Sequence, residues 1–140
     1  MKTRHLVLAL CLVLASGAAV PLLAAPGDYV EIGGGGWSDM TLMAALDGAL
    51  WIIDDGTLYK VDKAGKYAEI GEGGWTHATF MVALDGALWI IDDGTLYKVD
   101  KAGKYTEIGE GGWTHTTAMT ALDGFIWIIN DGTLYRLTTK

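Results

Sequence analysis

The chain has 140 residues, of which 17 are acidic and 10 are lysine or arginine, so its formal net charge is −7. A chain of this length is the size of one domain. An acidic surface repels phosphate backbones and anionic lipids, so the composition argues against nucleic acid and membrane surfaces as partners.

The N-terminal segment has the layout of a secretory signal peptide. A charged start precedes an apolar run over residues 6–14 and a tail of small residues. We therefore expect residues 1–25 to be a signal peptide, with its cleavage position open, and residues 26–140 to be a secreted or periplasmic repeat domain. An uncleaved membrane anchor is the alternative. The only cysteine, Cys11, lies in this segment, so no disulfide is expected in the exported domain.

The rest of the chain is a repeat with a period of 38 residues. Residues 47–77 and 85–115 are identical except that Ala68 is replaced by Thr106. A looser third copy follows, and a partial copy covers residues 28–37. Self-similarity at this period is typical of solenoids, propellers and other symmetric arrays.

One repeat unit predicts four short β-strands. In the middle unit the expected strands are 78–84, 87–91, 95–100 and 104–108, and Asp-Gly or Ala-Gly turns separate them. The first two strands are almost wholly apolar, as in strands covered on both faces, whereas the last two alternate with charged residues. A four-stranded antiparallel meander of this kind is one blade of a β-propeller.

Counting strands along the chain predicts an all-β fold of three four-stranded blades. Residues 28–32 form a lone fourth-type strand, and the last unit, which ends near Leu137, lacks one. The N-terminal strand is therefore expected to complete the last blade, which would leave no open sheet edge.

Three blades are fewer than a propeller needs for closure. Two chains could form a homodimeric six-bladed ring, in which the N-terminal strand completes its own chain's last blade or its partner's. The other readings are an open array that needs partners, and a threefold β-trefoil or β-prism.

Three short elements recur in every unit and carry a resemblance to a known family. They are Ile-Gly-x-Gly-Gly-Trp (residues 32–37, 70–75 and 108–113), Gly-x-Leu-Trp (48–51 and 86–89, with a looser match at 124–127) and Leu-Tyr-Lys/Arg (58–60, 96–98 and 134–136). In this order they resemble the tachylectin and tectonin-type β-propeller repeat. The resemblance implies a lectin-like protein that binds N-acetylated sugars near the Gly-Gly-Trp loops. The units are shorter, and fewer, than those of the animal lectins in that family.

The candidate ligand-binding residues are the Gly-Gly-Trp triplets and the polar residue two positions after each tryptophan. They are Gly35, Gly36, Trp37, Asp39, Gly73, Gly74, Trp75, His77, Gly111, Gly112, Trp113 and His115. Glycines let a ligand approach the backbone, and a tryptophan face stacks on a sugar ring. The structural alternative is that the glycines make tight crossings between blades and the tryptophans are core wedges.

We expect no catalytic, metal or cofactor site. One histidine per unit, without a companion at ligand spacing, does not make a metal site. The Asp-Gly turns lack the alternating oxygens of a calcium loop. The same polar residues recur in each unit without a distinct nucleophile and base, so an enzyme is not expected. Glycans are the expected partners, bound weakly at several equivalent sites. A protein-interaction scaffold without sugar binding is the alternative.

Overall fold

The computed structural model describes residues 25–140, and the blades all lie within residues 31–140. The predicted signal peptide, apart from Ala25, therefore lies outside the described residues, and so does Cys11. Residues 25–140 contain eleven β-strands and no α-helix, so the predicted all-β class is confirmed. It follows that the described part holds no helix long and apolar enough to cross a membrane.

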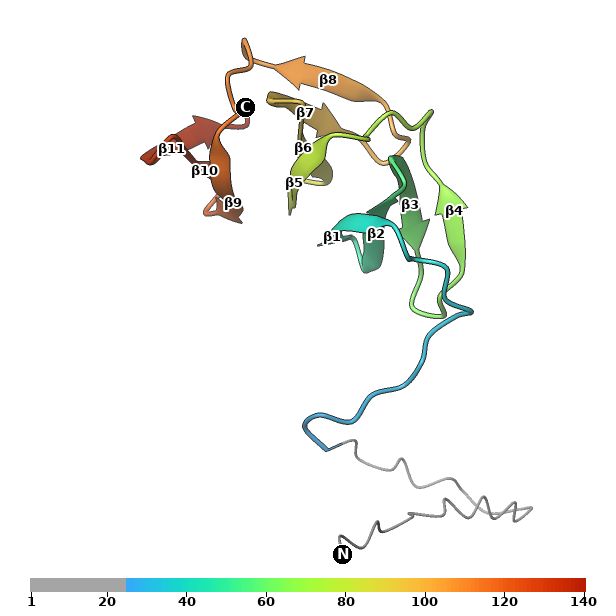
Figure 1. The fold of residues 1–140 in the computed structure, drawn as a ribbon. Coiled ribbons are helices and arrows are strands. Elements are labelled where there is room, and N and C mark those ends of the chain that lie inside the picture. Colours follow the sequence, from blue (N-terminus) through green and yellow to red (C-terminus); the bar gives the residue numbers. More distant parts are fainter. Residues whose placement is uncertain (1–24) are drawn as a thin grey trace, which may run out of the picture. The chain divides into compact units, whose positions relative to one another are not determined.

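The eleven strands form three antiparallel sheets, one for each repeat unit (Figure 1). The first sheet contains β1 (Met40–Leu46), β2 (Ala49–Asp54), β3 (Thr57–Val61) and β4 (Tyr67–Glu69). The second contains β5 (Ala78–Leu84), β6 (Ala87–Asp92), β7 (Thr95–Val99) and β8 (Tyr105–Ile108). The third contains β9 (Thr116–Leu122), β10 (Phe125–Asn130) and β11 (Thr133–Thr138). The first two sheets are the four-stranded meanders that the sequence predicts.

Two-residue Asp-Gly turns join the first three strands of each sheet. In the second sheet Asp85 and Gly86 have φ of 51° and 74°, and Asp93 and Gly94 have φ of 45° and 74°. Two consecutive residues with positive φ give a turn whose twist matches that of the paired strands. Aspartate tolerates this conformation and glycine adopts it without steric cost, which is why this dipeptide recurs at each of these two-residue turns.

The sheets pack face to face in chain order through apolar side chains. We call the side of a sheet toward the next sheet its forward face, and the opposite side its rear face. One cluster joins the forward face of the first sheet to the rear face of the second, and its buried members are Leu46, Trp51, Ile53, Leu58, Trp75, Met81, Leu88, Ile90 and Val99. A second cluster joins the second sheet to the third through Trp89, Ile91, Leu96, Ile126 and Ile128. The first strands of the sheets, β1, β5 and β9, are also neighbours in this order.

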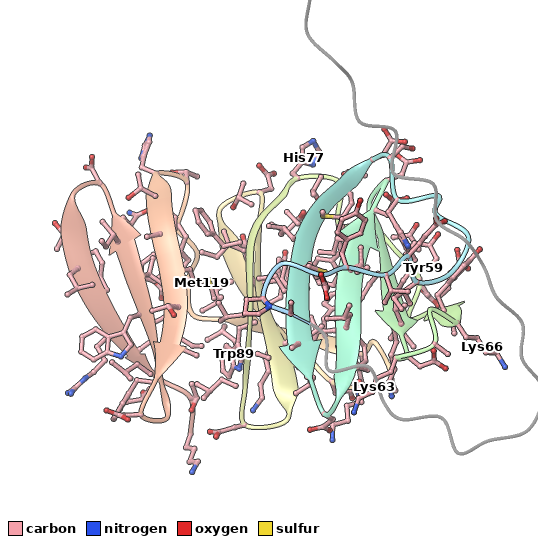
Figure 2. The ribbon with its side chains drawn as sticks, turned by 90° about the horizontal axis from the view of Figure 1, so that it is seen from below. Tyr59, Lys63, Lys66, His77, Trp89 and Met119 are labelled. Atoms are coloured by element: carbon pink, nitrogen blue, oxygen red, sulfur yellow. The ribbon has the colours of Figure 1, made fainter. Side chains whose placement is uncertain are left out.

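A buried tryptophan anchors each of these two junctions. Trp51 and Trp89 occupy the same place on β2 and β6, and Figure 2 shows Trp89 among the packed side chains. The Trp51 Nε1 donates a hydrogen bond to the Leu46 carbonyl at 3.3 Å, and the Trp89 Nε1 donates to the Leu84 carbonyl at 3.2 Å. A buried indole therefore keeps its one polar group satisfied while its large ring fills the space between sheets.

The expected completion of the last blade is not what the structure shows within one chain. Residues 28–32 form no strand, and the third sheet has only three, so the outer edge of β11 is unpaired within the described residues. Pairing with β11 would need the first and third sheets to meet around a ring. Instead, the rear face of the first sheet exposes Met43 and Leu50, and the forward face of the third exposes Leu122, Ile129 and Leu134, because three blades do not close. The threefold trefoil and prism alternatives need that closure and do not describe this chain.

Candidate functional site

Two equivalent pockets lie at the Gly-Gly-Trp loops of the first and second sheets. The second-sheet pocket has a volume of about 110 Å³ and is lined by Gly73, Gly74, Trp75, Asp92, Tyr97 and Tyr105. The first-sheet pocket has a volume of about 80 Å³ and is lined by Gly35, Gly36, Trp37, Asp54, Tyr59 and Tyr67. Each residue of one set is 38 positions from its counterpart in the other, so the repeat builds the same pocket twice.

Backbone geometry at the glycines shapes the second-sheet pocket. Gly73 and Gly74 have φ of 75° and 96°, a backbone conformation that residues other than glycine rarely adopt. A side chain at Gly74 would meet no atom within 4 Å, so this glycine also leaves open space beside the pocket. The next residue is fixed, because the Trp75 N–H donates to the Gly56 carbonyl of the first sheet at 2.9 Å.

Three aromatic rings form one wall of each pocket. Trp75 lies edge-on to Tyr97 and to Tyr105, with ring centroids 5.6 Å apart in both pairs, and Tyr97 and Tyr105 are 5.6 Å apart. Such edge-to-face contacts are favourable and hold the rings in fixed orientations. Trp75 is only 6% exposed, whereas Tyr105 is 57% exposed. Tyr105 is therefore the ring on which a ligand can stack, and Trp75 closes the wall from behind.

A half-buried carboxylate faces these rings. Burial raises the pKa of the Asp92 carboxyl above its usual value, and the hydrogen bond from the His77 backbone N–H to Asp92 Oδ1, at 3.0 Å, offsets part of that rise. In the third sheet Asn130 takes this place and accepts the His115 N–H at 3.1 Å. The position therefore needs a side-chain oxygen for the fold, and a negative charge is not required there.

The structure does not place the predicted histidines in the Gly-Gly-Trp pockets. His77 lines a separate hollow of about 390 Å³ with Thr114 and Gly94. Its carbonyl accepts the Asp93 N–H at 3.3 Å, so its backbone fastens the β6–β7 turn while its side chain stays exposed. Figure 2 shows His77 at one end of the sheets and Lys63 at the other. His115 and Asp39 hold the matching turns in the same way, with Asp39 donating its N–H to Asp54.

The third Gly-Gly-Trp position, at Gly111, Gly112 and Trp113, has only part of the aromatic wall. Trp113 and Tyr135 lie edge-on with centroids 5.5 Å apart. The first two sheets add a second tyrosine from the outer strand, Tyr67 in β4 and Tyr105 in β8. The third sheet has no outer strand, so no residue of the same chain takes that place within residues 31–140.

Sequence reasoning missed the tyrosines and the aspartate of the pocket wall. Asp92, Tyr97 and Tyr105 are absent from the candidate residues that the sequence indicated. Their recurrence with the same 38-residue period as the Gly-Gly-Trp triplets was the available signal.

A larger hollow of about 530 Å³ covers the rear face of the first sheet, and Met43, Leu50 and Ile52 contribute to its lining. The equivalent residues of the second sheet are buried against the first. This hollow is therefore an uncovered packing surface and a poor candidate for a small-molecule site. Within residues 25–140, no three His, Cys, Asp or Glu side chains group together as metal ligands would.

No protein-family model matches the sequence, and no curated protein matches it either. The structure is similar to a symmetrical protein described as emerging by de novo evolution under folding constraints, with 22% identity and a TM-score of 0.61 over 75% of this chain and 53% of that one. It is also similar to the extracellular domain of a one component system from B. thetaiotaomicron, with 16% identity and a TM-score of 0.55 over 72% and 15% of the two chains. A streptogramin B lyase matches with 19% identity and a TM-score of 0.51 over 72% and 41%.

These neighbours are β-propellers, so the three sheets are propeller blades. The chain spans about half the length, or less, of each of these structures. At these identities the similarity establishes the fold alone, and the tectonin-type repeat stays an interpretation of the sequence.

Proposed function

We propose that the protein is a lectin-like binder of N-acetylated sugars, with equivalent sites at its Gly-Gly-Trp pockets. The observation that carries this proposal is the duplicated pocket, in which two glycines, a carboxylate and three edge-to-face aromatic rings recur at the same places. Apolar rings beside a few convergent polar groups are the usual composition of a small-molecule site.

The pocket size fits a ring substituent better than a whole sugar. A volume of about 110 Å³ is well below the roughly 300–1,000 Å³ of typical ligand pockets. An acetamido group suits it chemically, since its methyl group would contact Trp75 and Tyr97 while its N–H would donate to Asp92. Tyr105 also borders a second hollow, of about 410 Å³, that Gly71, Glu72 and Lys104 help to line. The sugar ring would lie there, against the exposed face of Tyr105.

Repetition compensates for the small size of each site. A pocket that holds one substituent gives weak binding, but equivalent pockets on one protein raise the overall avidity for a multivalent glycan without any new contact. A secreted or periplasmic protein would meet such glycans, which agrees with the expectation of a signal peptide.

The test is a glycan array followed by titration calorimetry with N-acetylglucosamine, and with glucose as the matched sugar that lacks the acetamido group. We expect N-acetylglucosamine to bind and glucose to bind at least tenfold more weakly. Tyr105→Ala should remove the second-sheet site and Tyr67→Ala the first-sheet site, while Tyr105→Phe, which keeps the ring, retains most of the affinity. Lys63→Ala, at the opposite end of the sheets, is the control. If no N-acetylated sugar binds, the proposal is wrong and the protein-interaction scaffold is the better description.

A further inference from the structure

The two outermost faces of the three-blade unit expose residues whose repeat counterparts are buried. Leu50 on the rear face of the first sheet is 41% exposed, whereas its counterpart Leu88 is fully buried between sheets. Leu134 on the forward face of the third sheet is 60% exposed, whereas its counterpart Leu96 is fully buried. Contiguous apolar surface of this kind marks an interaction site or an aggregation liability.

These two faces are the halves of a junction that the chain already contains twice. A forward face packs on a rear face between the first and second sheets, and again between the second and third. The exposed forward face of the third sheet carries Leu122, Trp127, Ile129 and Leu134 at the positions of Leu84, Trp89, Ile91 and Leu96. The rear face of the first sheet carries Met43, Leu50, Ile52 and Val61 at the positions of Met81, Leu88, Ile90 and Val99. Met43 and Leu50 are exposed there, whereas Ile52 and Val61 are already buried in the single chain. A second copy of this chain therefore fits each exposed face.

The number of copies follows from ring closure. Propellers typically close with four to eight blades. A chain that supplies three blades reaches this range only as a pair, because one copy gives three blades and three copies give nine. Head-to-tail interfaces of one type form closed rings when the rotation closes.

We propose that two copies of the chain join head to tail into one six-bladed ring, and that Tyr29 of each copy completes the incomplete aromatic wall at Trp113 and Tyr135 of the other. This inference goes beyond sugar binding and does not depend on it. Tyr29 precedes Tyr67 by one repeat, and its side chain is almost fully exposed in the single chain.

The entry into the first sheet supports this assignment. A Cβ at Gly33 would lie 3.2 Å from the Gly65 carbonyl oxygen, and a Cβ at Gly71 would lie 3.1 Å from the Gly103 carbonyl oxygen. The chain thus crosses the first sheet at Gly33 as it crosses the second at Gly71. In the second case the preceding residues are the outer strand β4 of the neighbouring blade. By the same relation, residues 28–32 are the outer strand of a blade that precedes the first sheet, and in the ring this is the third blade of the other copy.

The register of the two complete sheets gives the pairing. Lys60 faces Ala68 in the first sheet and Lys98 faces Thr106 in the second. One repeat further along, Arg136 faces the partner's Val30. The same relation places the partner's Tyr29 opposite Leu137 and its Glu31 opposite Tyr135.

Polar contacts at the turns are also complementary across the proposed junction. Lys101 of the second sheet forms an ion pair with Asp47 of the first. At the next junction Thr139 donates a hydrogen bond to Asp85 at 3.3 Å. At the junction between copies the corresponding residues are Lys63 of one chain and Asp123 of the other, which carry opposite charges.

The first experiment measures the mass of the purified protein by analytical ultracentrifugation. We expect two chains for the wild type and one folded chain for Leu134→Glu, because that change puts a charge on an interface residue that is exposed in the single chain. Thr106→Glu on the outer strand β8 is the control and should stay a dimer. A wild-type mass of one chain, or of any assembly other than two, overturns the proposal, as does a Leu134→Glu variant that stays dimeric.

The second experiment tests which chain supplies the N-terminal strand. Val30→Cys and Arg136→Cys are combined in a Cys11→Ser background and oxidised. We expect a disulfide that links two chains, seen as a band of twice the chain mass on a non-reducing gel. The control pair Glu31→Cys with Arg136→Cys is one residue out of register, which puts the two thiols on opposite faces, and it should not cross-link. A disulfide within one chain, or none, overturns the assignment of Tyr29 to the partner.

Discussion

Replacing Gly103 with alanine should destabilise the protein much more than the same change at Gly86. Both glycines lie in turns of the second sheet and have similar positive φ, 84° and 74°. They differ in their surroundings. A Cβ at Gly103 would lie 2.6 Å from the backbone N and Cα of Gly71, whereas at Gly86 the nearest atom is Lys101 Cε at 4.0 Å.

Alanine at Gly103 has a conformational cost and a steric cost. The comparison with Gly86 separates them, because the conformational cost of a residue with positive φ applies at both positions. Placing a non-glycine residue in the left-handed region costs about 1–2 kcal/mol, which is the full expected loss for Gly86→Ala. At Gly103 the neighbour is backbone, so the chain leaving the first sheet must move, and overpacking of this kind adds about 1–3 kcal/mol. Gly103→Ala should therefore lower the free energy of unfolding by about 2–5 kcal/mol in total.

Urea unfolding at one fixed protein concentration measures both values, and unchanged m-values would show that the comparison reports stability. Equal losses at the two positions would refute the reasoning. They would mean that the segment around Gly71 is not held against the Gly103 turn, and so that the passage of the chain from one blade to the next is not packed as described.

Two further predictions concern the pocket carboxylate and the blade junctions. Because burial raises the pKa of Asp92, the folded state binds its proton more tightly than the unfolded state does, so stability falls as the pH rises from the ordinary aspartate range through the raised pKa. Asp92→Asn, which copies Asn130 of the third sheet, should remove that loss, and urea unfolding at neutral pH and at pH 3 should show stabilisation only at neutral pH. At the junctions, Leu96→Ala should cost about 2–5 kcal/mol of unfolding free energy because Leu96 is fully buried. Leu134→Ala should instead weaken the association of chains, and a loss at Leu134 that is equal to the one at Leu96 and independent of protein concentration would contradict this.

The features that could be predicted from the sequence are those that one repeat determines locally. Asp85-Gly86 predicted a hairpin because few other dipeptides adopt two consecutive positive φ angles at low cost. The continuous apolar run of residues 87–91 predicted a strand covered on both faces, and these residues are all buried. The hairpin depends only on neighbours in sequence. Residues 87–91 are covered by the first and third sheets, but an uninterrupted apolar run indicates two covered faces without showing what covers them.

The features that sequence reasoning missed depend on contacts between units. The N-terminal strand was expected to complete a last blade, that of its own chain or of a partner, but strand complementarity alone does not show whether three blades close. The role of Tyr105 was missed for a similar reason. It lies next to Trp75 only after β8 has paired with β7, which brings together residues 30 positions apart. His77 was predicted from its nearness in sequence to Trp75, yet the chain turns between them and directs the two side chains to different hollows.

The near-identity of the first two blades has a consequence for how the chain folds. Residues 47–77 and 85–115, which contain β2–β4 and β6–β8, differ at one position, so a strand of one set matches the register of the other, and cross-strand pairing alone does not distinguish native from exchanged pairing. Kinetics can make that distinction. Hairpins closed by two-residue turns form in about 1–10 μs, and pairing across 38 residues must first close a much longer loop. The boundary of each blade is therefore encoded by chain connectivity, and the tight Asp-Gly turns direct each strand to its own neighbour.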